Sequence, residues 1–255
     1  MEAKAEIISH NINSLTVPDP IKVGLREFVS QVVDLYGEDL VSVSAFGSAV
    51  SGDYDPAESD INLLIVYSDL DIVELARVAD LSRRGLRKHK FAPRFLSKRN
   101  IDDSTAYFQI DFLSMRDAHI VICGQDVLAG VQIQPEQLCW QIAYEVKAMR
   151  MRLKQQYWRT VDDPERMRVV LAARFTSLVH LMRALLLLKG LPAPVRRQET
   201  IEAAVQHFGI DGESAARLLE LRRGKRLEKE ALNELFARLM EMIRVIDARV
   251  EETTV

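Results

Sequence analysis

The chain has 255 residues, of which 48% are hydrophobic and 28% are charged. This composition is typical of a soluble globular protein, and the length suits one large domain or two smaller ones. The formal net charge of −3 excludes a strong overall attraction to nucleic acid or to an anionic membrane. The 2 cysteines have no metal-type spacing, and the N-terminus has no apolar leader pattern, so we expect a cytoplasmic protein.

The first predicted helix covers residues 20–36, after a stretch over 1–17 without a strong pattern. Pro18-Asp19-Pro20 is a helix-start pattern, with Asp19 as the cap and Pro20 in the first turn. Apolar residues then recur at helical spacing until Gly37, which is a typical helix end.

Two short runs rich in β-branched and aromatic residues, 41–46 and 61–67, are predicted to be buried strands. Gly47 and Ser48 follow the first of them. Glycine lets a ligand approach the backbone closely, and serine adds a hydroxyl group beside backbone N–H donors. The sequence therefore predicts a phosphate-binding turn at Gly47 and Ser48.

Asp60 and Asn62 stand at the opening of the second strand. Because side chains alternate along a strand, both residues are expected on the same side, with Ile61 on the other. A phosphate cradle would then face a pair of oxygen ligands.

The middle of the chain is predicted to contain a helix over 71–89 and strands over 91–96, 107–113 and 119–123. The basic end of that helix is interpreted as a solvated helix end, since no interleaved aromatic residues indicate nucleic-acid stacking. Asp111 falls in the middle of the 107–113 run. An unpaired buried carboxylate would be costly there, so a cation or hydrogen-bond donors must meet it.

Beyond Pro135 the strand patterns give way to helical periodicity, interrupted by proline and glycine. The longest apolar run, Ala184–Leu188, is too short to span a bilayer. We therefore predict an α/β domain over residues 1–132 and a helical bundle over 133–255. The predicted helices cover residues 135–158, 164–190, 197–208, 213–223 and 229–251.

The Gly47-Ser48 pair, Gly52 and the acidic strand opening at Asp60 resemble the nucleotidyltransferase fold of the DNA polymerase β superfamily. That group includes aminoglycoside nucleotidyltransferases, and the chain also resembles uncharacterised bacterial nucleotidyltransferase-domain proteins of this size. The resemblance implies a mixed-sheet α/β domain followed by an all-α bundle. It also implies a nucleoside triphosphate substrate, with ATP the first candidate, held at Gly47 and Ser48.

The family pattern has Asp-x-Asp followed by a third carboxylate on a later strand. The resemblance therefore implies that Asp60, Asn62 and Asp111 hold Mg²⁺ or Mn²⁺, with Asp60 and Asp111 catalytic. The alternative for Asp111 is a carboxylate satisfied by backbone N–H groups or an arginine. Glu145 stands where aminoglycoside members of the family place a catalytic base, and its alternative is a surface ion pair.

Asn62 departs from the family pattern because a neutral amide replaces the second aspartate. Loss of one charge about 4 Å from a cation removes roughly 4 kcal/mol per cation charge at an effective dielectric constant near 20. Two hypotheses follow: a Mg²⁺-dependent nucleotidyltransferase acting on an acceptor hydroxyl, or a catalytically impaired nucleotide-binding or protein-interaction module. The sequence names neither the acceptor nor the oligomeric state, and a homodimer is left open.

Overall fold

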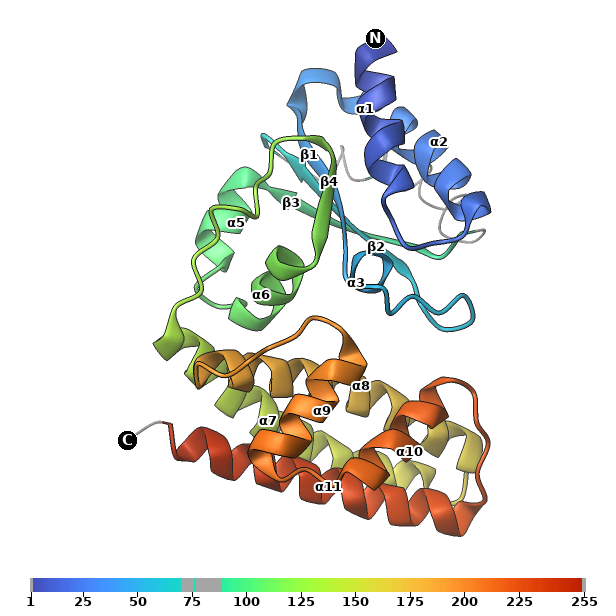
Figure 1. Ribbon diagram of the computed structural model, residues 1–255, viewed down its shortest axis with the longest axis vertical. Coiled ribbons are helices and arrows are strands. Elements are labelled where there is room, and N and C mark those ends of the chain that lie inside the picture. The colour runs from blue at the N-terminus through green and yellow to red at the C-terminus, as the bar shows by residue number, and fades with distance from the viewer. Residues whose placement is uncertain (1, 70–75, 77–88, 254–255) are drawn as a thin grey trace. The chain divides into compact units, whose positions relative to one another are not determined.

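The computed structural model describes residues 2–69, 76 and 89–253 (Figure 1). The helix predicted over residues 71–89 lies almost entirely outside the described residues. The chain divides into two compact units, Met1–Gln132 and Ile133–Val255.

A mixed sheet organises the N-terminal unit, and its described strands follow the order β3-β2-β1-β4. The strands are β1 (Leu40–Phe46), β2 (Ile61–Tyr67), β3 (Phe91–Ser97) and β4 (His119–Gly124). β1 pairs in antiparallel fashion with both β2 and β4, whereas β2 and β3 run parallel. The strands predicted over 41–46, 61–67, 91–96 and 119–123 are thus present, and the last of them lies at an edge of the sheet.

Helices cover both faces of this sheet (Figure 1). α1 (Glu2–Asn13) and α2 (Asp19–Tyr36) lie on one face, while α5 (Lys98–Ser104) and α6 (Gln109–Asp117) lie on the other. The apolar residues of α1 and α2 pack on alternate strand residues, as expected for a half-buried strand pattern. The strand residues in this core include Val43, Ala45, Ile61, Leu63, Ile65, Tyr67, Phe91 and Ile122.

The strand predicted over 107–113 is wrong, because Asp111 lies in the first turn of α6. The buried residues of this segment are Gln109, Ile110, Phe112, Leu113 and Met115. Neighbouring residues such as Phe112 and Leu113 are both buried, which suits a helix rather than a strand with one buried face, in which side chains alternate between the two faces. The helix α1, within the stretch without a strong pattern, was not predicted either.

The C-terminal unit is helical throughout its described elements. Its helices are α7 (Pro135–Thr160), α8 (Pro164–Leu188), α9 (Arg197–Phe208), α10 (Gly212–Arg222) and α11 (Lys229–Glu251). Asp163 and Asp211 cap α8 and α10 by accepting hydrogen bonds from the backbone N–H groups of Arg166 and Ser214. These caps and the helix-initiating prolines explain why the helix starts could be predicted closely from the sequence.

α8 is the central helix of this unit, since it packs against α7, α9, α10 and α11. Among the described helices, it alone is long and apolar enough to cross a membrane by length and composition. Its side chains from Leu181 to Leu186 are all buried against the neighbouring helices. This burial favours its interpretation as the core helix of the bundle.

Candidate functional site

One row of residues crosses the sheet from β4 to β3. His119 pairs with Phe46, Phe46 pairs with Asn62, and Asn62 pairs with Ala92. Their chain neighbours Ala45, Ile61 and Phe91 belong to the core under α1 and α2. Because side chains alternate, the row lies on the opposite face of the sheet. We refer to His119, Phe46, Asn62 and Ala92 as the site row.

Gly47 places a tight turn directly beside this row. Its φ of 75° and ψ of −139° lie outside the regions that side chains favour. A Cβ atom at Gly47 would lie 3.3 Å from Nδ2 of Asn62. The Gly47 carbonyl accepts hydrogen bonds of 2.9 Å from Val50 N and Ser51 N, which start the short helix α3 (Ser48–Ser51). The structure therefore brings the predicted phosphate turn and Asn62 together.

Asp60 lies immediately before β2 and is exposed. The loop that leads to it is a compact turn, in which Asp55 Oδ1 accepts a 2.9 Å hydrogen bond from Ala57 N. Burial raises the pKa of Tyr54, and the carboxylates of Asp55 and Asp60 raise it further. Asp60 thus contributes negative charge at the start of β2, whereas Asp55 orders the turn.

Asp111 meets an arginine rather than other carboxylates. Arg94 Nη1 lies 3.0 Å from Asp111 Oδ1, and the Arg94 guanidinium carbon lies 5.6 Å from the centroid of the Phe46 ring. Arg94 is two residues after Ala92 on β3 and therefore shares its face of the sheet. Both charged side chains are about half exposed, at 52% and 45%. Such a pair contributes about 0–1 kcal/mol, so it can open at little cost when a ligand competes for either charge.

The predicted metal ligands Asp60, Asn62 and Asp111 offer two carboxylates and one neutral amide. The position opposite Asn62 on the neighbouring strand is Ala92, which offers no ligand atom on its side chain. Over the described residues, no group of three or more histidine, cysteine, aspartate or glutamate side chains could hold a metal ion. Mg²⁺ prefers several oxygen ligands in near-octahedral geometry. The assignment of Asp60, Asn62 and Asp111 as metal ligands stays a prediction.

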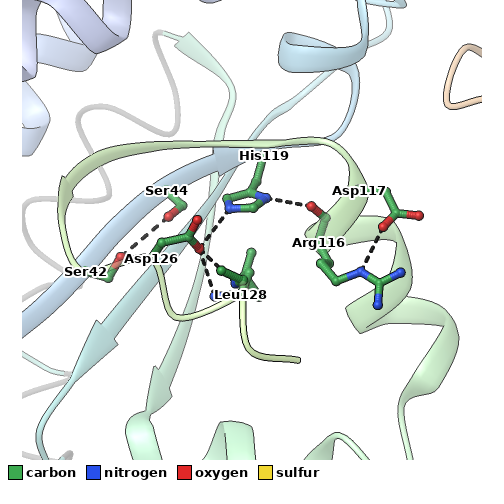
Figure 2. Close-up of polar contacts among 8 residues, drawn as sticks. Ser42, Ser44, Arg116, Asp117, His119, Asp126 and Leu128 are labelled. Carbon is green, nitrogen blue, oxygen red and sulfur yellow. Dashed lines mark hydrogen bonds and ion pairs between the residues drawn. The ribbon is translucent and has the colours of Figure 1, made fainter. Parts of the chain in front are cut away.

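The β4 end of the site row is held by a polar cluster (Figure 2). His119 Nδ1 lies 2.7 Å from the Arg116 carbonyl oxygen, and His119 Nε2 lies 3.0 Å from Asp126 Oδ1. The same carboxylate oxygen accepts hydrogen bonds from Leu128 N and Ala129 N. Burial by itself would raise the pKa of Asp126, but the hydrogen bonds from His119 and from these backbone groups lower it overall. The cluster ties β4 to the segment that follows it.

Glu145 belongs to the helical unit, on α7. Its carboxylate Oε2 lies 3.8 Å from Nη1 of Arg152, at the long end of ion-pair distances. Its role as a catalytic base stays a prediction.

Sequence reasoning missed Arg94 and His119 as neighbours of the site. A single arginine within the apolar run of β3 was a signal that this strand has a functional face. The pairing register that places Arg94 and His119 at the row is a property of the assembled sheet, so no local pattern could reveal it.

Comparisons with known proteins give one relative in sequence and one solved structure with a shared fold. No family model matches the chain. The chain is 27% identical over 113 residues to a Methanocaldococcus jannaschii protein named "Putative protein adenylyltransferase MJ1305", which covers 43% of this chain and 67% of that protein. The crystal structure of spectinomycin adenyltransferase AAD(9) from Enterococcus faecialis, with ATP and spectinomycin, superposes with a TM-score of 0.57 at 13% identity.

The superposition with AAD(9) covers 88% of this chain and 97% of that chain, so it includes residues of both units. A toxin–antitoxin structure with AMP-PNP matches at a TM-score of only 0.29 and 14% identity, over 54% of this chain and 95% of that chain. That value is too low to support an inference. The chain shares the fold of AAD(9) and resembles an archaeal protein named a putative protein adenylyltransferase, and these findings support a nucleotidyltransferase-type protein.

Proposed function

We propose that the chain transfers a nucleoside monophosphate from a nucleoside triphosphate, with ATP as the donor, to an acceptor hydroxyl. The observation that carries this proposal is the Gly47 turn packed against Asn62, beside the exposed carboxylate of Asp60. ATP is proposed because the archaeal relative is named a putative protein adenylyltransferase and the AAD(9) crystal structure contains ATP.

In this proposal, each residue around the site row contacts a different part of the nucleotide. At Gly47 the absence of a Cβ allows phosphate oxygens to approach the backbone. The Ser48 hydroxyl has no hydrogen-bond partner in the described part of the chain, so it is available as a donor to phosphate. Arg94 supplies a positive charge on the same face, which a phosphate group can attract away from Asp111. Asp60 would hold the cation that accompanies the nucleotide, since nucleoside triphosphates are bound as Mg²⁺ complexes.

In the proposed reaction, the acceptor oxygen forms a bond to the α-phosphorus, and the bond from that phosphorus to the β-phosphate oxygen breaks, releasing pyrophosphate. The hydroxyl proton passes to a carboxylate. Asp111 in the N-terminal unit and Glu145 in the helical unit are the two candidates. The variants Asp111→Asn and Glu145→Gln show which of the two is the base. Only loss of the base removes the increase in rate that accompanies its deprotonation as the pH rises.

A second function, nucleotide binding without turnover, is favoured by a specific set of observations. Asn62 is neutral, Ala92 stands opposite it, and Asp111 is engaged by Arg94. Each of these lowers the negative charge available to a divalent cation at the row. A nucleotide-binding regulator or interaction module would need only the Gly47 turn and its neighbours.

Labelled ATP distinguishes the two functions. The protein is incubated with cell extract, Mg²⁺ and ATP that carries the label on either the α- or the γ-phosphate. Nucleotidyl transfer moves the α-label, and never the γ-label, onto an acceptor that mass spectrometry then identifies. Saturable ATP binding with no transferred label would instead establish the binding function.

Two variants link either result to the site. Gly47→Val should abolish nucleotide binding, because its side chain would press on Asn62. Gly130→Val is the matched control, since a Cβ at Gly130 meets nothing within 4 Å. ATP binding that survives Gly47→Val in a folded protein would contradict both functions.

A further inference from the structure

Four large apolar side chains form a stripe along one side of α7. Trp140, Tyr144, Met151 and Trp158 are 65%, 52%, 67% and 81% exposed. On an ideal helix these positions lie within about 40° of one another around the axis. The Trp140 and Tyr144 rings stack, with centroids 5.6 Å apart and planes 11° from parallel. We refer to these four residues as the α7 stripe.

The stripe is separate from the face by which α7 joins its own bundle. The buried apolar residues of α7 are Leu138, Ile142, Val146, Met149 and Leu153. On an ideal helix their common direction lies about 180° from the stripe. α7 is therefore apolar on two opposite sides. A helix with this pattern is normally covered on both of them.

The stripe is large enough to be an interface. From Trp140 to Trp158 it is about 27 Å long, at 1.5 Å per residue. Since an aromatic side chain buries about 150–250 Å² when covered, the four side chains together present on the order of 500 Å². A stable interface needs about 800 Å² from each partner, so the stripe with its polar margins is the right size for one. The largest patch on a typical monomer is about 300–600 Å² and is often functional.

The charges of α7 indicate what covers the stripe. The first half of the helix, 135–146, carries only the acids Glu136 and Glu145. The second half, 147–160, carries only basic charged residues, which are Lys147, Arg150, Arg152, Lys154 and Arg159. Lys147 and Arg150 already form ion pairs with Asp247 of α11 in the same chain. Two α7 helices side by side in antiparallel orientation place the acidic half of each against the remaining basic residues of the other, such as Lys154 and Arg159. A parallel pair would place like charges together.

We propose that the chain forms a symmetric homodimer in which two α7 stripes pack against each other in antiparallel orientation. The two-fold axis passes through the stripe at the level midway between residues 140 and 158, so that Trp140 of one copy meets Trp158 of the partner subunit. Such an interface is self-complementary, because each copy offers the same patch and receives it. Tryptophan and tyrosine are the residue types that most often anchor interfaces.

The chain contains only 2 tryptophans, Trp140 and Trp158, and both lie on the stripe. Intrinsic tryptophan fluorescence therefore reports on the interface alone. On dilution of the full-length protein, we expect the mass measured by light scattering to fall from dimer to monomer. The tryptophan emission should shift to longer wavelength over the same concentration range, as water reaches the rings. High salt should move both transitions to higher protein concentration, since the flanking charges are exposed.

Single substitutions test the surface without touching the bundle core. Trp158→Glu, at the most exposed position, should leave the circular dichroism spectrum unchanged and raise the dimer dissociation constant at least tenfold. Trp158→Ala should raise it less, because it adds no charge to the interface. Val169→Glu is the matched control: Val169 is 52% exposed on α8, outside the stripe, and its variant should dimerise like the parent.

Three results would overturn the proposal. One is a protein that stays monomeric at every concentration. Another is a dimer that is unaffected by Trp158→Glu and whose tryptophan emission does not change on dilution. The third is a monomer whose tryptophan emission shifts only when anionic lipid vesicles are added, which would assign the stripe to a membrane surface.

Discussion

Asn62→Asp is the substitution that most directly tests the charge of the site row. It replaces a neutral amide with a carboxylate of nearly the same shape, next to the Gly47 turn. One added charge about 4 Å from a cation is worth roughly 4 kcal/mol per cation charge at an effective dielectric constant of 20, and about 1 kcal/mol in water. Asn62 is only partly buried and Asp60 is exposed, so the true value lies toward the aqueous limit.

Desolvation of the new carboxylate and its attraction to Arg94 reduce the gain further. We therefore expect a net gain near 1.4 kcal/mol, which is about a tenfold decrease in the Mg²⁺ concentration that half-saturates the protein. The assay is a Mg²⁺ titration of ATP binding, repeated for transfer of the α-label. Mn²⁺ should give half-saturation at lower concentration than Mg²⁺ in the parent protein.

The matched control is Gln206→Glu, which makes the same amide-to-acid change at an exposed position of α9. It should leave the Mg²⁺ titration unchanged. With Asp60→Asn, added Mg²⁺ should no longer increase ATP binding or transfer of the α-label. If Asn62→Asp and Asp60→Asn both leave the titration as it is in the parent, these residues face no cation, and the electrostatic reasoning is wrong.

Three further predictions concern Asp111, Gly124 and Asp126. Asp111→Asn should lower the free energy of unfolding by less than about 1 kcal/mol, because its pair with Arg94 is half exposed; a much larger loss in urea denaturation would show that the pair is structural. Gly124→Ala should lower the free energy of unfolding by about 3 kcal/mol or more, because its Cβ would lie 2.1 Å from the Val41 carbonyl oxygen at a φ of +87°. Gly209→Ala is the control: with open space around the Cβ and a φ of +74°, it should lower the free energy of unfolding by only about 1 kcal/mol. The lowered pKa of Asp126 contributes stability above the ordinary aspartate pKa of about 4, and this contribution is lost as the pH falls through the lower folded-state value. Asp126→Asn should therefore lower the melting temperature at neutral pH. In acid, the melting temperatures of the variant and the parent should become equal. A difference that persists in strong acid would contradict the assignment.

Local patterns in the sequence were sufficient for most of the elements. β1 and β2 could be predicted because each is a short run rich in β-branched and aromatic residues, and Gly47 follows the first. The helices of the C-terminal unit could be predicted because proline, glycine and capping aspartates mark their ends. Local information was ambiguous at 107–113, where a short segment of five apolar residues with Gln109 and Asp111 among them suits either a strand or a helix.

The sequence by itself also identified the chemical elements of the candidate site: the Gly47 turn, the acid at Asp60 and the neutral amide at Asn62. Only the tertiary structure decided what stands beside them. Strand register aligns Ala92 with Asn62 and brings Arg94 over Phe46, and helix formation at α6 presents Asp111 to Arg94. These contacts join residues that are far apart in the chain. They depend on hydrogen-bond pairing across the whole sheet and on packing against it, which no short segment encodes alone.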